Sequence, residues 1–524
     1  MKLRTIVKIA ITSSVVLLCS GFALYSFFRL SAAEGQKDFN LYELVPSTTS
    51  AVFVTDDVLE FVAEVDELTC SKNQQYLYVS KLFSYLKQSL YALSEDTPHG
   101  LSRQMNQMLI SFHEPDNERN QVLYCRLGNG DKELVNRFVR KYISSLYPPK
   151  TFIYKGEEII IYPMADGDFL ACYLTSDFMA LSFQKKLIEN VIDAYKSGKS
   201  LADDSTFTGI RAPKKSAAAA TIYTRMQGMI GWTEFDMKMK DDFIYFSGIT
   251  HDADTCFAFI NQLRQQQSVE GFPGEVLPST AFYFSRQGIT DWVSLLSYGN
   301  AQGQSVPART SEVQNRDKEF SRYLMENAGQ DLVACLFQRE DTLQGAAAVL
   351  SLSVADVTEA ERMLRALVNA ASADEGRRNP RITFCYTVNK AYLVYRLPQT
   401  TLFEQLTSFA EPTLDVYAAF YGGRLLLAPD ADALAHYIRQ LDKGEVLNGA
   451  MAYQTGMDHL SDSYHFMLMA DFDHIFQQSE NHVRFVPDFF LRNADFFRHF
   501  TLFVQFACAD GMVYPNIVLK YKSE

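Results

Sequence analysis

The sequence contains three letters that also close the phosphate-binding loop of nucleotide hydrolases, Gly198-Lys199-Ser200. Such a loop cradles phosphate with successive backbone N–H groups at the start of a helix. Here the letters follow the apolar, helix-period stripe from Leu187 to Tyr195, and the residue five positions before Gly198 is Asp193 rather than glycine. A glycine directly after an apolar helix is typical of a C-terminal cap with positive φ. We therefore predict a helix end here and no phosphate site.

A second group of reactive side chains lies between Asp458 and Phe476, in "DHLSDSYHFMLMADFDHIF". The residues of metal-ligating or acid–base type in it are His459, His465, Asp471, Asp473 and His474. Their spacing matches no metal template, so polar residues at the two ends of a buried strand explain the pattern better. The catalytic signatures Gly-x-Ser-x-Gly, His-Glu-x-x-His and Gly-x-Gly-x-x-Gly after a strand are also missing from the sequence. We predict no catalytic, cofactor or metal site.

Paired phenylalanines form the third pattern, in "DFFLRNADFFRHF" from Asp488 to Phe500. Two pairs lie seven residues apart and would share one face of a helix: Phe489, Phe490, Phe496 and Phe497. Such a stripe could dock on a partner or on a membrane surface. More often such a stripe is core, where aromatic side chains are common. These four residues are the candidate interaction surface.

The elements that carry these residues occur twice along the chain. "LSFQKKLIENVIDAYKSGKSL" from Leu181 aligns without gaps with "LAPDADALAHYIRQLDKGEVL" from Leu427, at an offset of 246 residues that places Gly198 opposite Gly444. Three further matched blocks follow the same order in both copies: "VPSTTSAVFVT" with "LPSTAFYFS", "GDKELVNRFVRKYI" with "ADVTEAERMLRALV", and "TFIY" with "TFCY". Ordered blocks at a nearly fixed period indicate a tandem duplication of whole domains. We assign repeat domain 1 to residues 42–270 and repeat domain 2 to residues 271–524.

Each copy alternates helices with runs of short β-branched and aromatic segments joined by turn residues. This order predicts the α+β class, with two tandem copies of a mainly antiparallel sheet that carries helices on one face.

The N-terminus predicts a membrane anchor. Residues 9–28 are 20 uncharged residues, which is enough for a helix to cross about 30 Å of hydrocarbon, and Lys2, Arg4 and Lys8 precede them. This arrangement predicts a cytoplasmic N-terminus over residues 1–8, one transmembrane helix over 9–28, a linker over 29–41, and the bulk of the chain in the periplasm, attached to the inner membrane. Two alternatives stay open: a signal peptide cleaved near Ser31-Ala32-Ala33, and a lipid-modified Cys19.

Net charge and cysteine content restrict the partners and the cross-links that we expect. The net charge of −13 disfavours nucleic acid, whose phosphates an acidic surface repels. Seven cysteines follow the predicted anchor, scattered through apolar strand-like runs without a Cys-x-x-Cys pair. They suit small buried hydrophobes better than a disulfide framework, which remains the alternative. The predicted partners are the membrane, through the N-terminal helix, and an envelope protein.

An anchor followed by two copies that each open on a Pro-Ser-Thr turn, at Pro46 and Pro278, and an apolar strand resembles an uncharacterised family of proteins. These are duplicated, membrane-anchored envelope proteins of Bacteroidetes-type bacteria. The resemblance implies a location and an architecture, and it implies no activity.

Three hypotheses of function follow. The first is a non-enzymatic, membrane-anchored envelope scaffold or interaction protein, supported by the anchor and the duplication. The second is a ligand-binding protein that uses a cleft between the repeats, because domain interfaces commonly form pockets. The third is a hydrolase with dispersed carboxylates.

Overall fold

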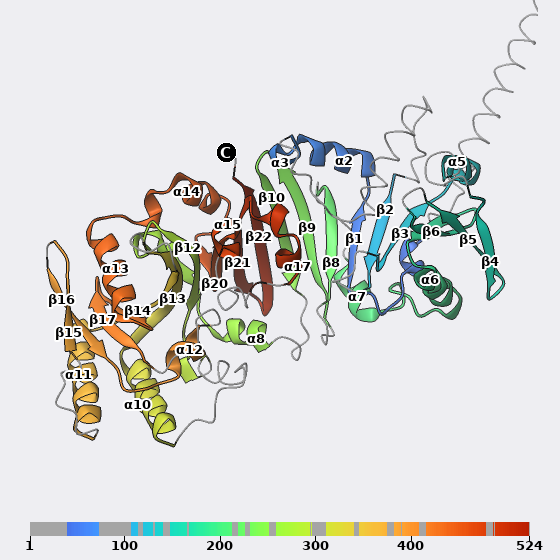
Figure 1. The fold of residues 1–524 in the computed structure, drawn as a ribbon. Helices are drawn as coiled ribbons and strands as arrows, with labels where there is room; N and C mark the ends of the chain where they lie inside the picture. The colour runs from blue at the N-terminus through green and yellow to red at the C-terminus, as the bar shows by residue number, and fades with distance from the viewer. Residues whose placement is uncertain are drawn as a thin grey trace, which may run out of the picture.

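One antiparallel sheet of 20 strands runs through the whole molecule, as the computed structural model in Figure 1 shows. The structure describes residues 39–522 with interruptions, and residues 1–38 and 523–524 lie outside the described part. The interruptions are residues 73–105, 114–118, 129–130, 140–146, 165–166, 212–217, 226–230, 251–257, 294, 296–310, 340–344, 375–381, 389, 408–414, 478–485 and 487.

The sheet consists of two halves with the same order of strands. From the outer edge inward, the first half is β4 (Lys150–Tyr154), β5 (Glu157–Pro163), β6 (Phe169–Leu174), β7 (Phe178–Ser182), β3 (Gln121–Arg126), β2 (Met108–Phe112), β1 (Ala51–Thr55), β8 (Ala220–Thr224), β9 (Thr233–Lys240) and β10 (Phe243–Thr250). The second half, in the same direction, is β15 (Ile382–Tyr386), β16 (Ala391–Arg396), β17 (Tyr417–Tyr421), β18 (Arg424–Ala428), β14 (Ala346–Val354), β13 (Ala328–Gln338), β12 (Ala281–Gly288), β20 (Phe466–Asp471), β21 (Phe500–Ala509) and β22 (Met512–Tyr521). Equivalent strands therefore occupy equivalent places.

The two halves join through their innermost strands. β10 pairs antiparallel with β22, from Phe243 opposite Lys520 to Thr250 opposite Val513. In Figure 1 these strands lie side by side in the middle of the sheet, green beside dark red. A short second sheet, β11 (Val269–Glu270) with β19 (Ser463–Tyr464), lies at the start of the second half.

Helices cover both faces of the sheet. One face carries a single apolar core that extends across both halves, and the helices that contribute buried or partly buried side chains to it are α2 (Val58–Glu67), α3 (Thr69–Lys72), α5 (Asp131–Phe138), α10 (Ser311–Asn327), α11 (Val357–Asp374), α12 (Leu402–Leu406), α15 (Phe472–Phe476), α17 (Asp488–Arg492) and α18 (Ala494–Phe497). The other face has a separate core in each half: under η1 (Leu41–Leu44), α6 (Lys185–Ser197) and α7 (Ser205–Ile210) in the first, and under α13 (Ala431–Asp442), η4 (Leu447–Gly449) and α14 (Met451–Met457) in the second. The remaining elements are α8 (Ala258–Gln265) and η3 (Pro273–Glu275).

The predicted fold class is therefore wrong in two respects. The strands form one continuous sheet instead of two, and helices cover two faces instead of one. The burial of the strands explains the second error: β7 and most of β3 and β13 are buried at consecutive positions, which requires cover on both sides. By contrast, β9 and β10 at the joint are mostly half-buried or exposed.

The predicted membrane topology also needs correction. Among the described residues, no helix has both the length and the apolar character needed to cross a membrane. The structure thus does not support a single-pass inner-membrane protein, and the segment 9–28 on which that prediction depended lies outside the described residues.

Candidate functional site

The Gly-Lys-Ser letters lie at a helix end, as predicted. α6 ends at Ser197, and Gly198 follows in the left-handed conformation with φ of 63°. Its backbone N–H donates to the carbonyl oxygen of Ala194, which closes the last turn. Gly444, at the equivalent place after α13, also has positive φ. Carbonyl groups rather than N–H groups are exposed at such an end, so it offers phosphate no donors.

The histidine and aspartate group is dispersed by the fold. The His459 ring packs against Phe243 of the first half, and His465 lies between β19 and β20. Asp471 accepts hydrogen bonds from backbone groups at the start of α15 and from Lys522 Nζ at 2.7 Å. The carboxylate of Asp471 also raises the pKa of His474 through a hydrogen bond. Within the described part of the chain, no group of three such residues could hold a metal ion.

The phenylalanine stripe lies on the shared core. Phe497 is buried, while Phe490 and Phe496 are partly buried and pack against the same core. The rings of Phe490 and Phe497 meet edge to face with centroids 4.8 Å apart, and Phe496 lies 4.9 Å from Phe500. Phe489 belongs to α17, and its side chain lies outside the described part. The three described rings make the contacts of core residues.

A pocket of about 430 Å³ lies beneath η1 in the first half. Its floor is formed by four neighbouring strands, β3, β2, β1 and β8, and its rim includes α7. The lining residues are Leu41, Tyr42, Val54, Asp56, Gln107, Leu109, Arg126, Thr208, Arg211 and Tyr223. A volume of this size is within the range of small-molecule sites.

Polar groups line the pocket on two sides. The Arg211 guanidinium lies 4.1 Å from the centroid of the Tyr42 ring, and Arg126 Nε donates to the carbonyl oxygen of Phe39 at 2.6 Å. Gln107 Nε2 donates to Asp56 Oδ1 at 2.6 Å. The Oε1 atom of Gln107 is buried and has no hydrogen-bond partner among the described residues. A buried acceptor without a donor costs stability unless water or a ligand satisfies it.

The Tyr42 hydroxyl shows that charges of both signs converge here. Burial raises the pKa of Tyr42 to about 12, and four charged groups act on it as well. Arg211 and Arg126 lower this pKa, whereas Asp56 and Glu234 raise it. Burial also raises the pKa of Tyr223, so both phenols stay protonated at neutral pH. The pocket lining therefore combines two cations, Arg126 and Arg211, one anion, Asp56, and the neutral phenols of Tyr42 and Tyr223.

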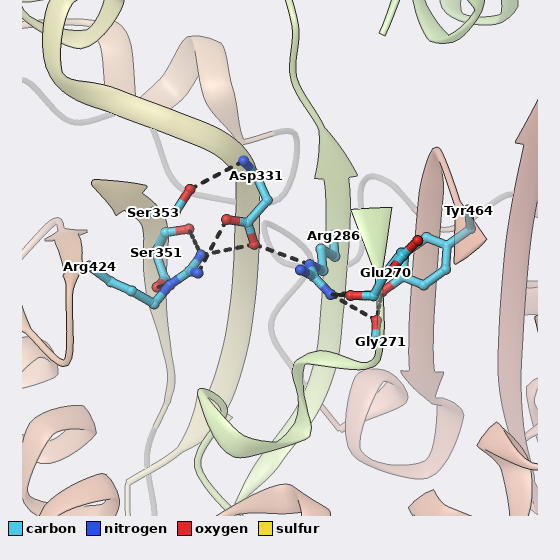
Figure 2. Close-up of polar contacts among 8 residues, drawn as sticks. All are labelled: Glu270, Gly271, Arg286, Asp331, Ser351, Ser353, Arg424 and Tyr464. Carbon is cyan, nitrogen blue, oxygen red and sulfur yellow. Dashed lines mark hydrogen bonds and ion pairs between the residues drawn. The ribbon is translucent and has the colours of Figure 1, made fainter. Parts of the chain in front are cut away.

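The second half has a buried ion network in the corresponding region, shown in Figure 2. Asp331 is only 6% exposed and lies between two guanidiniums, Arg286 with Nε at 3.1 Å and Arg424 with Nη1 at 3.2 Å. Burial alone would raise the pKa of Asp331, but Arg424, the Ser353 hydroxyl and Arg286 together hold it below the usual range. Arg286 also donates to the carbonyl oxygens of residues 270 and 271, and Arg424 to Ser351.

Strand register shows that the pocket and the network occupy equivalent places. Val54 of β1 is opposite Leu109, as Arg286 of β12 is opposite Val333. Two residues before Leu109 and Val333 are Gln107, which directly precedes β2, and Asp331 of β13.

The next strands continue this correspondence. Arg126 of β3 is opposite Phe178 of β7, as Ser353 of β14 is opposite Arg424 of β18. The counterparts of Arg286 and Asp331 in the first half are thus Val54 and Gln107, which line the pocket, and the counterpart of Arg424 is the buried ring of Phe178.

Sequence reasoning missed this pocket. Its residues come from six separate segments, and no local spacing connects Tyr42 with Gln107 or Arg211. One signal was available, since the ungapped alignment of Pro46 with Pro278 places Val54 opposite Arg286 when it is extended. A valine replaced by an arginine within a strand marks a site where the copies differ.

Comparison with known proteins adds no information on function. No family model matches the sequence, and it has no match among curated proteins or solved structures.

Proposed function

We propose that this chain is a binding protein that holds a small molecule in the pocket beneath η1. The observation that carries the proposal is the difference between the halves: Val54 and Gln107 line an open pocket in the first half, whereas their counterparts Arg286 and Asp331 form an ion network with Arg424 in the second. Closing such a space with paired charges satisfies every group within the protein. Leaving it open beside the charged side chains of Arg126, Arg211 and Asp56 is useful to a protein that recruits a ligand there.

The location differs from the cleft between the repeats, which was the site in the second hypothesis from the sequence. The halves meet edge to edge through β10 and β22, and the pocket lies inside the first half. The scaffold and hydrolase hypotheses make no use of this pocket.

The proposal can be tested by blocking the pocket. A library of small fragments would be screened against the full chain by ligand-observed NMR, with the wild type and two variants. Thr208→Trp places a large ring at the exposed rim, and Val54→Arg introduces the residue of the second half. Ser205→Trp is the control, because Ser205 is exposed on the same helix and does not line the pocket.

We expect mutually competing fragments that bind the wild type and Ser205→Trp at least tenfold more tightly than Thr208→Trp. Val54 is buried, so Val54→Arg could unfold the protein. Its binding result is therefore used only if its thermal unfolding midpoint stays near that of the wild type. If no fragment loses affinity on Thr208→Trp, or if Ser205→Trp has the same effect, the pocket is not a binding site.

A further inference from the structure

We propose that the outer edge of the second half is an interface at which two copies of this chain associate. The interface strand is β15, which pairs antiparallel with the β15 of a second copy, so that the sheet continues from one molecule into the next. This association is independent of the pocket beneath η1. It is carried by the open backbone of β15, by its exposed apolar side chains and by its self-complementary order of residues.

One side of the β15 backbone is open. Within the described part of the chain, β15 pairs with β16 and with no second strand, and Figure 1 shows this hairpin at the outer end of the sheet. The N–H of Thr387 donates to the carbonyl oxygen of Lys390 at 2.9 Å, which closes the hairpin. In antiparallel strands, residues that bond the partner alternate with residues that do not. The backbone N–H and C=O groups of Ile382, Phe384 and Tyr386 therefore point away from β16, where a further strand would pair with them.

The exposed side chains of β15 are apolar. Phe384 is 57% exposed and Tyr386 is 70% exposed, and their ring centroids lie 6.1 Å apart on one face of the strand. The strand Ile382–Tyr386 contains no charged residue. Proteins usually keep a sheet edge from pairing with other chains by placing charges or proline on it or by covering it. An uncharged aromatic edge therefore indicates a strand that pairs with a partner.

The opposite end of the sheet has the protection that β15 lacks. β4 is the outermost strand of the first half, and lysines accompany it. Lys150 belongs to the strand and is exposed, Lys155 directly follows it, and Lys185 Nζ lies 5.0 Å from the centroid of the Phe152 ring. Lysine at an edge disfavours pairing with another chain. Of these two outer edges, β15 is thus the one suited to association.

Two observations identify a second copy of this chain as the partner. The two halves already associate in this manner, because β10 and β22 pair antiparallel, edge to edge, at the joint. Like β15, β10 is an uncharged strand rich in aromatic and β-branched residues. In addition, β15 is complementary to itself: antiparallel pairing about Phe384 places Phe384 opposite its own copy and Ile382 opposite Tyr386. Such apolar cross-strand pairs stabilise a sheet, and no like charges meet.

This pairing has twofold symmetry about Phe384, so it gives a closed dimer. Pairing of β15 with the β4 of another copy would instead be head to tail and would give open filaments. The lysines beside β4 favour the dimer over the filament. Because the contact is confined to one short strand from each copy, it is smaller than a standard interface, and we expect a dissociation constant in the micromolar range.

The test measures the association of full-length protein by sedimentation over a micromolar concentration series, in a mild detergent that shields the apolar segment 9–28. Phe384→Lys places like charges opposite each other on the twofold axis. Phe384→Pro removes an outward N–H and leaves the bonds to β16 intact. Ile153→Pro is the control at the other edge. Ile153 is 71% exposed in β4, and the two-residue turn at Lys155-Gly156 places its N–H outward as well.

We expect a monomer–dimer equilibrium for the wild type and for Ile153→Pro. Both changes at Phe384 should raise the dissociation constant about tenfold or more. An equimolar mixture of Phe384→Lys and Phe384→Glu should recover the dimer, because opposite charges then meet on the axis. Recovery in the mixture also shows that the two variants fold.

Four results would overturn the inference. The first is a wild type that stays monomeric throughout the series. The second is a dimer that neither change at Phe384 weakens, or that Ile153→Pro weakens equally. The third is a filament that Ile153→Pro disperses, which would identify β4 as the partner strand. The fourth is a mixture of Phe384→Lys and Phe384→Glu that stays monomeric, which would contradict pairing about Phe384.

Discussion

Replacing Asp331 by asparagine tests whether the ion network holds the second half together. The change leaves Arg286 and Arg424 nearly buried without their shared anion, although both keep hydrogen bonds to oxygens of residues 270, 271 and 351. Removing one partner of a buried ion pair costs about 3–5 kcal/mol. Because the remaining acceptors offset part of the loss, we expect about 3 kcal/mol, roughly a hundredfold in the unfolding equilibrium.

The assay uses the one tryptophan of each half. The sequence has two tryptophans, Trp232 in the first half and Trp292 in the second, and both are buried. In a Trp232→Phe background, the fluorescence of Trp292 reports urea unfolding at the core that contains Trp292. With an m value of about 3 kcal/mol per M, the midpoint should fall by about 1 M urea. Asp415→Asn is the control, because its partner Arg396 lies at 3.0 Å and both side chains are nearly half exposed.

An exposed pair of this kind contributes about 0.2–1 kcal/mol. If Asp331→Asn costs no more than Asp415→Asn, the network does not stabilise the fold and the reasoning fails.

The pH dependence of stability gives a second check. The folded pKa of Asp331 lies below its unfolded value, so its contribution is complete above the unfolded pKa and is lost as pH falls through the folded one. The difference in free energy of unfolding between the wild type and Asp331→Asn should therefore become smaller at acidic pH.

Two further predictions concern single residues. Gly288→Ala should lower the thermal unfolding midpoint by several degrees, because an added Cβ would lie 2.1 Å from the backbone oxygen of Gln267. Gly449→Ala is the control and should change the midpoint little, because a Cβ there meets nothing within 4 Å. Equal midpoints for the two variants would refute the predicted clash. Burial lowers the pKa of His113 to about 4, so its imidazole signals in an NMR titration should stay unchanged down to about pH 5. The free energy of unfolding should decline as pH falls from about 6.5 towards 4, because the unfolded chain takes up the proton first. An NMR titration midpoint near pH 6.5 would contradict this assignment.

Local features of the fold could be read from the sequence because their physics is local. Gly198 ends a helix with positive φ, and Asp131 and Asp356 lie at helix starts, where the Asp131 carboxylate accepts from a preceding backbone N–H and the Asp356 carboxylate from following ones. Each of these needs only a residue and its neighbours within one helical turn.

Long-range features could not be read in this way. The pairing of β10 with β22 joins strands about 270 residues apart in the sequence. The residue types at the edge of a strand do not identify the strand that it pairs with. The cover on both sheet faces and the pocket beneath η1 likewise depend on packing between distant segments. Residues such as Tyr42 and Arg211 come together only after the sheet has formed.

The joint between the halves has the geometry of a twofold dimer enclosed in one chain. β10 and β22 are the last strands of their halves, and each pairs with the other along its length. Subunits related in this way normally meet only above a threshold concentration. A covalent link raises the effective concentration of each half to the millimolar range, so the joint survives dilution. It also frees the halves from the identity that a homodimer imposes, so one half can keep an open pocket while the other carries the ion network of Arg286, Asp331 and Arg424.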